Sequence, residues 1–500
     1  MRHISCVRYL TIAAIVLGVA AEIACSNTNN AVTAVAASET GKVPITTNSE
    51  EAKREYLQGR DLSERLLGTE SIQHFDKAIA LDPDFATAEL ARANNSPTAK
   101  EFFEHEKKAV SLADKSSEGE RLVIWANQAG TNGDVSKQRE YLEKLIAAYP
   151  NDERAQFALG TYCFGQQDYA GAVEHLKRAT ELAANYSPAY NLLGYSYRQQ
   201  ADWPNAEQAF KKYVELIPND PNPYDSYAEM LLKMGRFDDS ITQYHKALSV
   251  DSHFMASHFG ISADLMYTGK WDDASAELQR MADQARNDGE LRTAYFGMAV
   301  VAADSGKLDK ALLAMDKEYA VAEKKNDAAA MSADLLAKGN IYLEMQKYDV
   351  AAQTFDRSWQ LIQTSSLSQE IKDNNTLLHH FNLTAVAIGK KDFAAAKTHA
   401  EEYRTGVEAT HNPQLQKQAH ELAGRIAWAQ KDYDTAITEL QQANGQNPQN
   451  LYRLSLAYQG KGDHAKAQEY AGKAAAFNSL PQLNYAFIRV KAQKLAGGKA

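Results

Sequence analysis

The chain has 500 residues, of which 64 are Asp or Glu and 54 are Lys or Arg, so its formal net charge is −10. An acidic chain without a basic stripe does not suit the phosphate backbone of nucleic acids, and we expect no nucleic-acid partner. At about 150 residues per domain the length would hold three domains, yet no Pro/Gly-rich or Ser-rich linker interrupts residues 51–478. One continuous array is therefore favoured.

Residues 1–25 differ from the rest, because a short basic start precedes an apolar run over residues 9–21. This pattern is typical of a signal peptide and is shorter than the roughly 20 residues needed to span a bilayer. Cys25 stands where bacterial lipoproteins carry their acylated cysteine, which it resembles, although Glu22 replaces the usual Leu. We expect export to the periplasm and lipidation of Cys25 as the one membrane attachment. Cleavage after residues 19–21, releasing a soluble protein, stays open.

Residues 26–50 are rich in Ser, Thr, Asn and Ala and predict a disordered tether. Helix pairs are expected over 51–152, although their pattern is less regular. Gly68, Phe102 and Val135 stand where each second helix would open.

Four regular units follow over residues 153–288, where Tyr169, Trp203, Phe237 and Trp271 recur every 34 residues. A small residue precedes each aromatic by nine positions, and Ala or Ser follows it by three. A fixed period of this length marks a repeat array. We call positions that recur at the same place in each unit columns. Two helices per unit explain these columns, because the small residue lets the second helix cross the first closely and the aromatic fills the space between the two helices.

Five units of longer pitch are predicted over 289–478. Their second helices are expected to open at Leu308, Tyr348, Phe393, Tyr433 and His464. Residues 479–500 would form a capping helix and tail, with the helix over 480–494 covering the last apolar face and turning its charges to solvent.

Several columns together carry a family resemblance. Leu193-Gly194, Tyr197, Ala206, Phe210 and Pro218 match the tetratricopeptide repeat (TPR) pattern position by position. The chain resembles bacterial envelope TPR lipoproteins. The resemblance implies an all-α fold, a right-handed α-solenoid superhelix of about 12 antiparallel helix pairs.

The same resemblance implies where a partner binds, because first helices line the concave face in this family. Residues on that face would anchor an extended peptide or a helix of a protein partner. The groove residues so predicted are Phe157, Thr161, Phe164, Asn191, Tyr195, Arg198, Asp225, Glu229, Phe259 and Met266. These side chains also have a purely structural interpretation, since apolar stripes at helical spacing are often core.

The sequence predicts no catalytic residue, no metal site and no cofactor. The segments 105–109 and 420–424 begin with His-Glu but lack the second His of a zinc-peptidase helix. His379 and His380 are adjacent, so they point about 100 degrees apart on a helix, and a third ligand is missing. Cys163 falls in an apolar column and is expected to be a small buried hydrophobe.

We therefore expect a noncatalytic scaffold of the bacterial cell envelope that binds a protein or peptide. The main alternative is a glycan- or nutrient-binding lipoprotein built on the same repeats, although no long insertion between helix pairs is evident. A cytosolic adaptor would require that residues 1–25 not be a signal. An enzyme with its site in the C-terminal half would use the group Trp359, His379, His380, His399 and His411.

Overall fold

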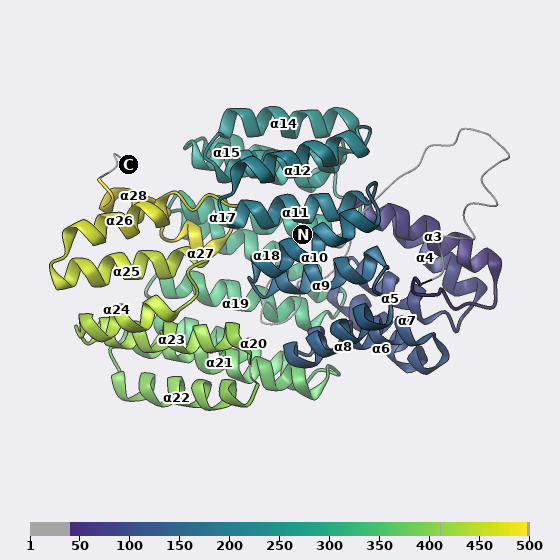
Figure 1. The fold of residues 1–500 in the computed structure, drawn as a ribbon. Coiled ribbons are helices and arrows are strands. Elements are labelled where there is room, and N and C mark those ends of the chain that lie inside the picture. The colour runs from purple at the N-terminus through teal and green to yellow at the C-terminus, as the bar shows by residue number, and fades with distance from the viewer. Residues whose placement is uncertain (1–40, 411, 498–500) are drawn as a thin grey trace. The chain divides into compact units, whose positions relative to one another are not determined.

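The computed structural model describes residues 41–410 and 412–497, and every regular element within them is a helix. The predicted signal peptide, Cys25 and most of the predicted tether lie outside these residues. Figure 1 shows the helices following one another as antiparallel neighbours. Their bounds are α3 (Glu50–Glu64), α4 (Gly68–Leu81), α5 (Ala86–Asn94), α6 (Ala99–Leu112), η1 (Ala113–Lys115), α7 (Glu118–Thr131), α8 (Val135–Ala148), α9 (Glu153–Gly165), α10 (Tyr169–Leu182), α11 (Ser187–Gln199), α12 (Trp203–Leu216), α13 (Pro221–Lys233), α14 (Phe237–Val250), α15 (Met255–Tyr267), α16 (Trp271–Asp283), α17 (Asp288–Asp304), α18 (Leu308–Lys324), α19 (Ala328–Glu344), α20 (Tyr348–Gln363), α21 (Gln369–Lys390), α22 (Phe393–Thr410), α23 (Pro413–Ala429), α24 (Tyr433–Gln442), α25 (Pro448–Lys461), α26 (His464–Ala475), α27 (Leu483–Ala486) and α28 (Arg489–Leu495).

The helices from α3 to α26 form twelve consecutive pairs within the described chain, as the sequence predicted. The second helices of the four regular units and of the five longer units begin at the residues expected for them. One start was wrong, because α6 begins at Ala99 and not at Phe102. Thr98 caps this helix by accepting a hydrogen bond from the Glu101 amide, so a local N-cap sets its start and not the aromatic residue.

A shared turn explains why these starts follow the sequence so closely. The residue two positions before a second helix has a positive φ in the pairs from α7–α8 onward, and in α3–α4. Glycine supplies this conformation in some turns, including Gly235 and Gly269. Other turns place a side chain there, as at Ala201, whose φ is 57°. An L-residue in this region is strained by roughly 1–2 kcal/mol.

Ala201→Gly is therefore expected to stabilise the protein by roughly 0.5–1 kcal/mol, because relief of the strain exceeds the entropy that glycine adds to the unfolded chain. Thermal or urea unfolding measures the change. The matched control is Ala320→Gly on the exposed face of α18, which should destabilise by about 1 kcal/mol. Destabilisation by both substitutions would contradict the assignment of strain to the turn.

The small column is the position in each first helix, nine residues before the second helix begins, that holds mostly small residues. Close helix crossings require the glycines at this position. A Cβ atom on Gly194 would lie 2.8 Å from the Phe210 ring, and one on Gly339 would lie 2.3 Å from the Phe355 ring. Both rings are buried and cannot move aside without opening the core. The small column is thus a packing requirement, as its spacing indicated.

The described residues divide into two compact units, one of residues 41–230 and 246–252 and the other of residues 231–245 and 253–497. In the first unit, residues 41–49 lie against the helices and do not extend the predicted tether. The Val43 amide donates to Asp152 at 2.8 Å, and the Thr46 amide donates to Glu120 at 2.9 Å. The expectation of disorder up to residue 50 was wrong for this stretch, because its backbone amides and the Thr47 hydroxyl find carboxylate partners on the repeats.

Ion pairs across long sequence separations also hold the first unit together. Arg154, at the start of α9, lies 3.0 Å from Glu64 at the end of α3. Arg65 lies 2.9 Å from Asp220, which immediately precedes α13 and is fully buried. The turn after α3 therefore contacts the starts of helices several pairs later. The spacing of the repeats does not predict these contacts between an early helix pair and later first helices.

In the second unit, the largest apolar cluster joins α15 to α19 with the residues that follow α26. The sequence predicted that these residues form one capping helix. They form two short helices instead, α27 and α28. We call residues 477–495 the C-terminal segment. α28 packs against α26 as a cap would, whereas α27 packs against α17. The run 483–488 explains the correction, because its mostly apolar residues cannot all be buried by one face of a single helix.

A buried charge cluster joins α17, α18 and α19 within this unit. The Arg292 guanidinium donates two hydrogen bonds to the Asp334 carboxylate, both at 2.7 Å, and lies 3.2 Å from a carboxylate oxygen of Glu318. All three side chains are at most 4% exposed.

No helix in the described part of the chain is long and apolar enough to cross a membrane.

Asp264 is a fully buried carboxyl group on α15. Burial raises its pKa to about 8, although a hydrogen bond from Ser240 opposes the shift. The folded protein therefore keeps a proton that the unfolded chain releases near pH 4, so this group lowers the free energy of unfolding as pH rises from about 4 to 8.

Asp264→Asn should consequently stabilise the protein at pH 7 and leave it unchanged near pH 4. The difference from wild type should grow by about 1 kcal/mol per pH unit between pH 5 and 7. Urea unfolding at several pH values measures it, with the fully exposed Asp272→Asn as control. A constant difference across this range would show that Asp264 is ionised in the folded protein.

Candidate functional site

The ten predicted groove residues have little solvent exposure and do not line an open groove. Nine of them are at most 9% exposed, and the Arg198 side chain is 11% exposed. Eight lie in the first unit, on α9, α11 and α13, and two lie in the second, on α15. The structure thus places the side chains on the expected first helices, but a partner could reach them only by displacing what covers them.

Packing within the first unit accounts for several of these positions. The Phe157 ring lies edge-on to Tyr186 with centroids 5.6 Å apart, and the Tyr195 ring lies edge-on to Phe210 at 5.2 Å. The Arg198 guanidinium stacks over the Tyr195 ring at 4.5 Å and pairs with Glu229. Tyr195 and Arg198 therefore already have partners within the unit.

In the second unit, the C-terminal segment covers part of the first helices. Arg489 of the C-terminal segment donates from Nε to Asp304 at 2.7 Å, and both side chains are at most 5% exposed. Asp304, at the end of α17, also accepts a hydrogen bond from the Trp271 indole at 2.8 Å. The Arg489 guanidinium lies 5.4 Å from the centre of the Tyr267 ring. A carboxylate and two aromatic residues thus form a receptor for one arginine.

Backbone contacts fix the start of the segment in the same place. Lys233 donates to the Phe477 carbonyl and lies 3.8 Å from the centre of the Phe477 ring. The Tyr267 hydroxyl donates to the Ser479 carbonyl, and the Tyr485 ring lies 5.7 Å from the Tyr267 ring. First helices of these repeats therefore bind the C-terminal segment through its carbonyls, its aromatic rings and one arginine.

This contact surface was not predicted from the sequence. Tyr267 and Asp304 were assigned no role, and Arg489 was expected to face solvent. The available signal was the apolar run 483–488, which is too continuous for a helix with a solvent-facing side. The position that the segment covers, about 185 residues earlier in the chain, has no signature in the spacing.

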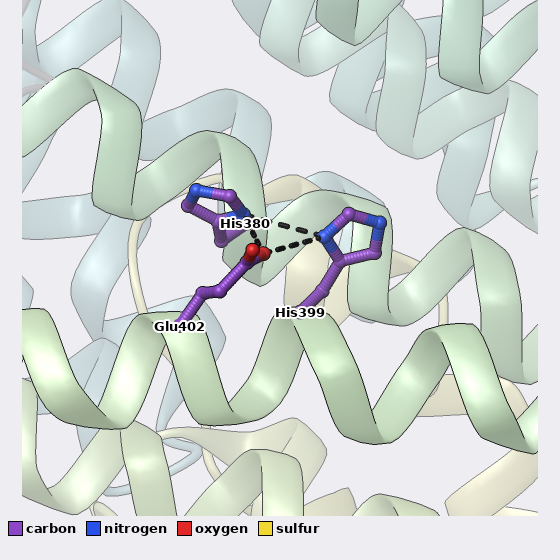
Figure 2. A group of neighbouring side chains, drawn as sticks. All are labelled: His380, His399 and Glu402. Carbon is purple, nitrogen blue, oxygen red and sulfur yellow. Dashed lines mark hydrogen bonds and ion pairs between the residues drawn. The ribbon is translucent and has the colours of Figure 1, made fainter.

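A second cluster lies between α21 and α22, where three potential metal ligands meet (Figure 2). His380 Nδ1 lies 2.9 Å from Glu402 Oε2 and 3.3 Å from His399 Nδ1. His399 Nδ1 lies 3.2 Å from the same carboxylate oxygen. The three side chains are between 24% and 48% exposed, so solvent reaches them.

The His379 and His380 side chains do not point toward one common ion. Their adjacency on the helix predicted this result. His379 stacks on Trp359 with ring centroids 5.3 Å apart, and its Nε2 atom lies 3.3 Å from Asp356. Burial lowers the pKa of both histidines. The partners of His380 come instead from α22. They were not predicted, because the sequence was read as lacking a third ligand. His411 lies outside the described residues.

Cys163 is buried on α9, as expected. Burial raises the pKa of its thiol to about 11, so the thiolate is scarce at neutral pH. This position is a packing residue, as its apolar column predicted.

Comparisons with known proteins give the following matches. Two family models, each described as tetratricopeptide repeat, match the chain. The first matches residues 125–187, and the second matches residues 187–220 and again residues 448–479. Anaphase-promoting complex subunit 3 of Schizosaccharomyces pombe is 22% identical over 40% of this chain and 29% of its own length. The TPR repeat-containing protein YpiA of Bacillus subtilis is 23% identical over 48% of this chain and 63% of its own length. The match thus spans less than two thirds of either relative.

Two solved structures are also similar. A tetratricopeptide repeat protein from Parabacteroides merdae has 14% identity and a TM-score of 0.36, covering 52% of this chain and 98% of its own. PilW, described as a widely conserved type IV pilus biogenesis factor, has 19% identity and a TM-score of 0.32, covering 44% and 96%.

Proposed function

This chain is a tetratricopeptide-repeat protein, and from that premise we propose that it is a noncatalytic scaffold of the bacterial cell envelope that binds a protein or peptide partner along its first helices. Proteins built from these repeats are generally noncatalytic scaffolds, and the repeats typically bind proteins or peptides. The proposal therefore needs a surface on which a partner would be recognised.

The observation that carries the proposal is the C-terminal segment on α13, α15 and α17. It contacts these first helices in three ways, through carbonyl groups, aromatic rings and the Arg489–Asp304 pair, and these contacts support peptide binding on the same surface. The partner that fits this surface is a peptide with aromatic residues and an arginine that replaces Arg489. It would occupy the face in place of the C-terminal segment.

The experiment is a crosslinking pull-down from envelope fractions of the native host, comparing wild type with Arg489→Ala. Loss of the arginine anchor should loosen the segment and increase recovery of a defined protein. Lys491→Ala is the matched control, because Lys491 makes only an exposed ion pair with Glu344. Equal recovery by all three proteins would reject the second-unit face as the binding surface. If no protein is recovered, glycan binding takes the place of protein binding.

The envelope location rests on the N-terminal sequence. An apolar run after a basic start, followed by Cys25, is the arrangement that supports an exported lipoprotein. Cys25→Ala should move the protein from the membrane fraction to the soluble fraction of the host. Cys6→Ala, within the same segment, should not. Membrane attachment that survives Cys25→Ala would reject lipidation at this residue.

A further inference from the structure

A recurring polar contact joins the two helices of several pairs. In each case a residue of the first helix faces the residue 19 positions later in the second, and at least one of them is a histidine. We call this set the inter-helix column. Within the part of the chain that the structure describes, its members are Glu55–His74, Gln156–His175, His258–Glu277, His380–His399 and His420–Glu439.

The column has one exception to its chemistry. Four members place a histidine opposite a carboxylate or an amide oxygen, which accepts a hydrogen bond from the ring. The α21–α22 pair places His399 opposite His380, with the two Nδ1 atoms 3.3 Å apart. Two imidazole nitrogens that face each other share either a proton, in a hydrogen bond whose donor depends on the tautomers, or a metal cation. This pair therefore differs from the other four because both of its facing atoms are nitrogen ligands.

The third donor comes from the same helix as His399. Glu402 lies three residues later and so projects from the same face of α22. Its Oε2 atom lies 2.9 Å from His380 Nδ1 and 3.2 Å from His399 Nδ1 (Figure 2). No arginine takes this carboxylate among the contacts of α22, because Arg404 pairs with Glu401 and Glu408.

The distances match those of a tetrahedral metal site. Ligand atoms about 2.0–2.1 Å from a zinc ion lie roughly 3.3–3.4 Å from one another at tetrahedral angles. The observed separations of 2.9, 3.2 and 3.3 Å require outward shifts of a few tenths of an ångström at most. The triangle of donors is thus close to one face of such a tetrahedron.

We propose that His380, His399 and Glu402 form a binding site for a divalent transition-metal ion of the zinc type. Two neutral imidazoles and one carboxylate are borderline ligands that suit zinc better than magnesium or calcium, which prefer oxygen ligands. The three side chains are partly exposed, so water completes the coordination. The ion links α21 to α22 in place of the hydrogen bond found in the other column pairs.

The first test is calorimetric titration of the full chain with zinc chloride. Wild type should bind zinc at one high-affinity site, and His399→Ala should weaken this binding by more than about 10-fold. The matched control is His420→Ala, which removes a histidine from the same column in the next pair, where it faces Glu439. Equal zinc affinity in wild type and His399→Ala, or an equal loss in His420→Ala, would overturn the proposal.

A second test separates ligand loss from structural damage. Cobalt(II) bound by wild type should give the intense visible absorption of a four-coordinate ion, and Glu402→Gln, which preserves shape, should abolish or shift it. Zinc should raise the melting temperature of wild type but not of Glu402→Gln, whereas magnesium should raise neither. An unchanged cobalt spectrum in Glu402→Gln would exclude this carboxylate as a ligand, and equal stabilisation by magnesium would exclude a transition-metal site.

Discussion

Arg489→Ala is expected to destabilise the second unit by about 3–5 kcal/mol, because removing one partner of a buried ion pair leaves the other charge uncompensated. The Asp304 carboxylate is fully buried and would keep only the Trp271 indole as a hydrogen-bond donor among its side-chain contacts. The C-terminal segment would then lose its anchor on α17. Urea unfolding measures the loss, and hydrogen exchange over residues 477–495 shows where it occurs.

Two further variants define this result. Lys491→Ala should cost less than about 1 kcal/mol, since its pair with Glu344 is exposed. Arg489→Met with Asp304→Leu should recover part of the stability, because matched apolar residues often replace a buried ion pair without loss. If Arg489→Ala were as mild as Lys491→Ala, the segment would not be anchored by this pair, and the proposed competition with a partner would lose its basis.

Arg292→Ala is expected to have an effect of similar size, about 3–5 kcal/mol, for the same reason in a different place. Arg292 compensates two buried carboxylates, those of Asp334 and Glu318, and so ties three successive helices together. Burial raises the pKa of Asp334 while Arg292 opposes this shift. Without the arginine, one carboxyl group must take up a proton on folding, so the variant should lose more stability at pH 8 than at pH 5.

The comparison for this variant is Arg404→Ala on α22. Arg404 also pairs with two carboxylates, Glu401 and Glu408, but all three side chains are at least half exposed. Its removal should cost less than about 1 kcal/mol and show little pH dependence. Urea midpoints at pH 5 and pH 8 test both variants together. A pH-independent loss in Arg292→Ala would mean that no carboxyl group changes protonation on folding.

The repeats could be predicted from the sequence because their determinants are local. A turn with a positive φ at a fixed position precedes nearly every second helix, and the small column follows from contacts within one pair. Both are visible within 34 residues. Most second-helix starts were correct for this reason, and the exception at α6 has its own N-cap at Thr98.

The candidate sites depended on contacts between distant residues and were not predicted. Arg65 meets Asp220, and Arg489 meets Asp304, through the way successive pairs stack, which no single unit encodes. The His380–His399 contact is different. Its separation of 19 residues recurs in four other pairs, so this spacing was available in the sequence and was overlooked.

The position of the C-terminal segment also has a consequence for synthesis. α17 ends at Asp304, and α27, the helix that covers its apolar face, begins at Leu483. At roughly 5–20 residues per second, the ribosome needs about 9–36 seconds to make the intervening chain. During that interval the face is bare on the nascent protein. A chaperone or partner present then meets a surface that the completed chain conceals.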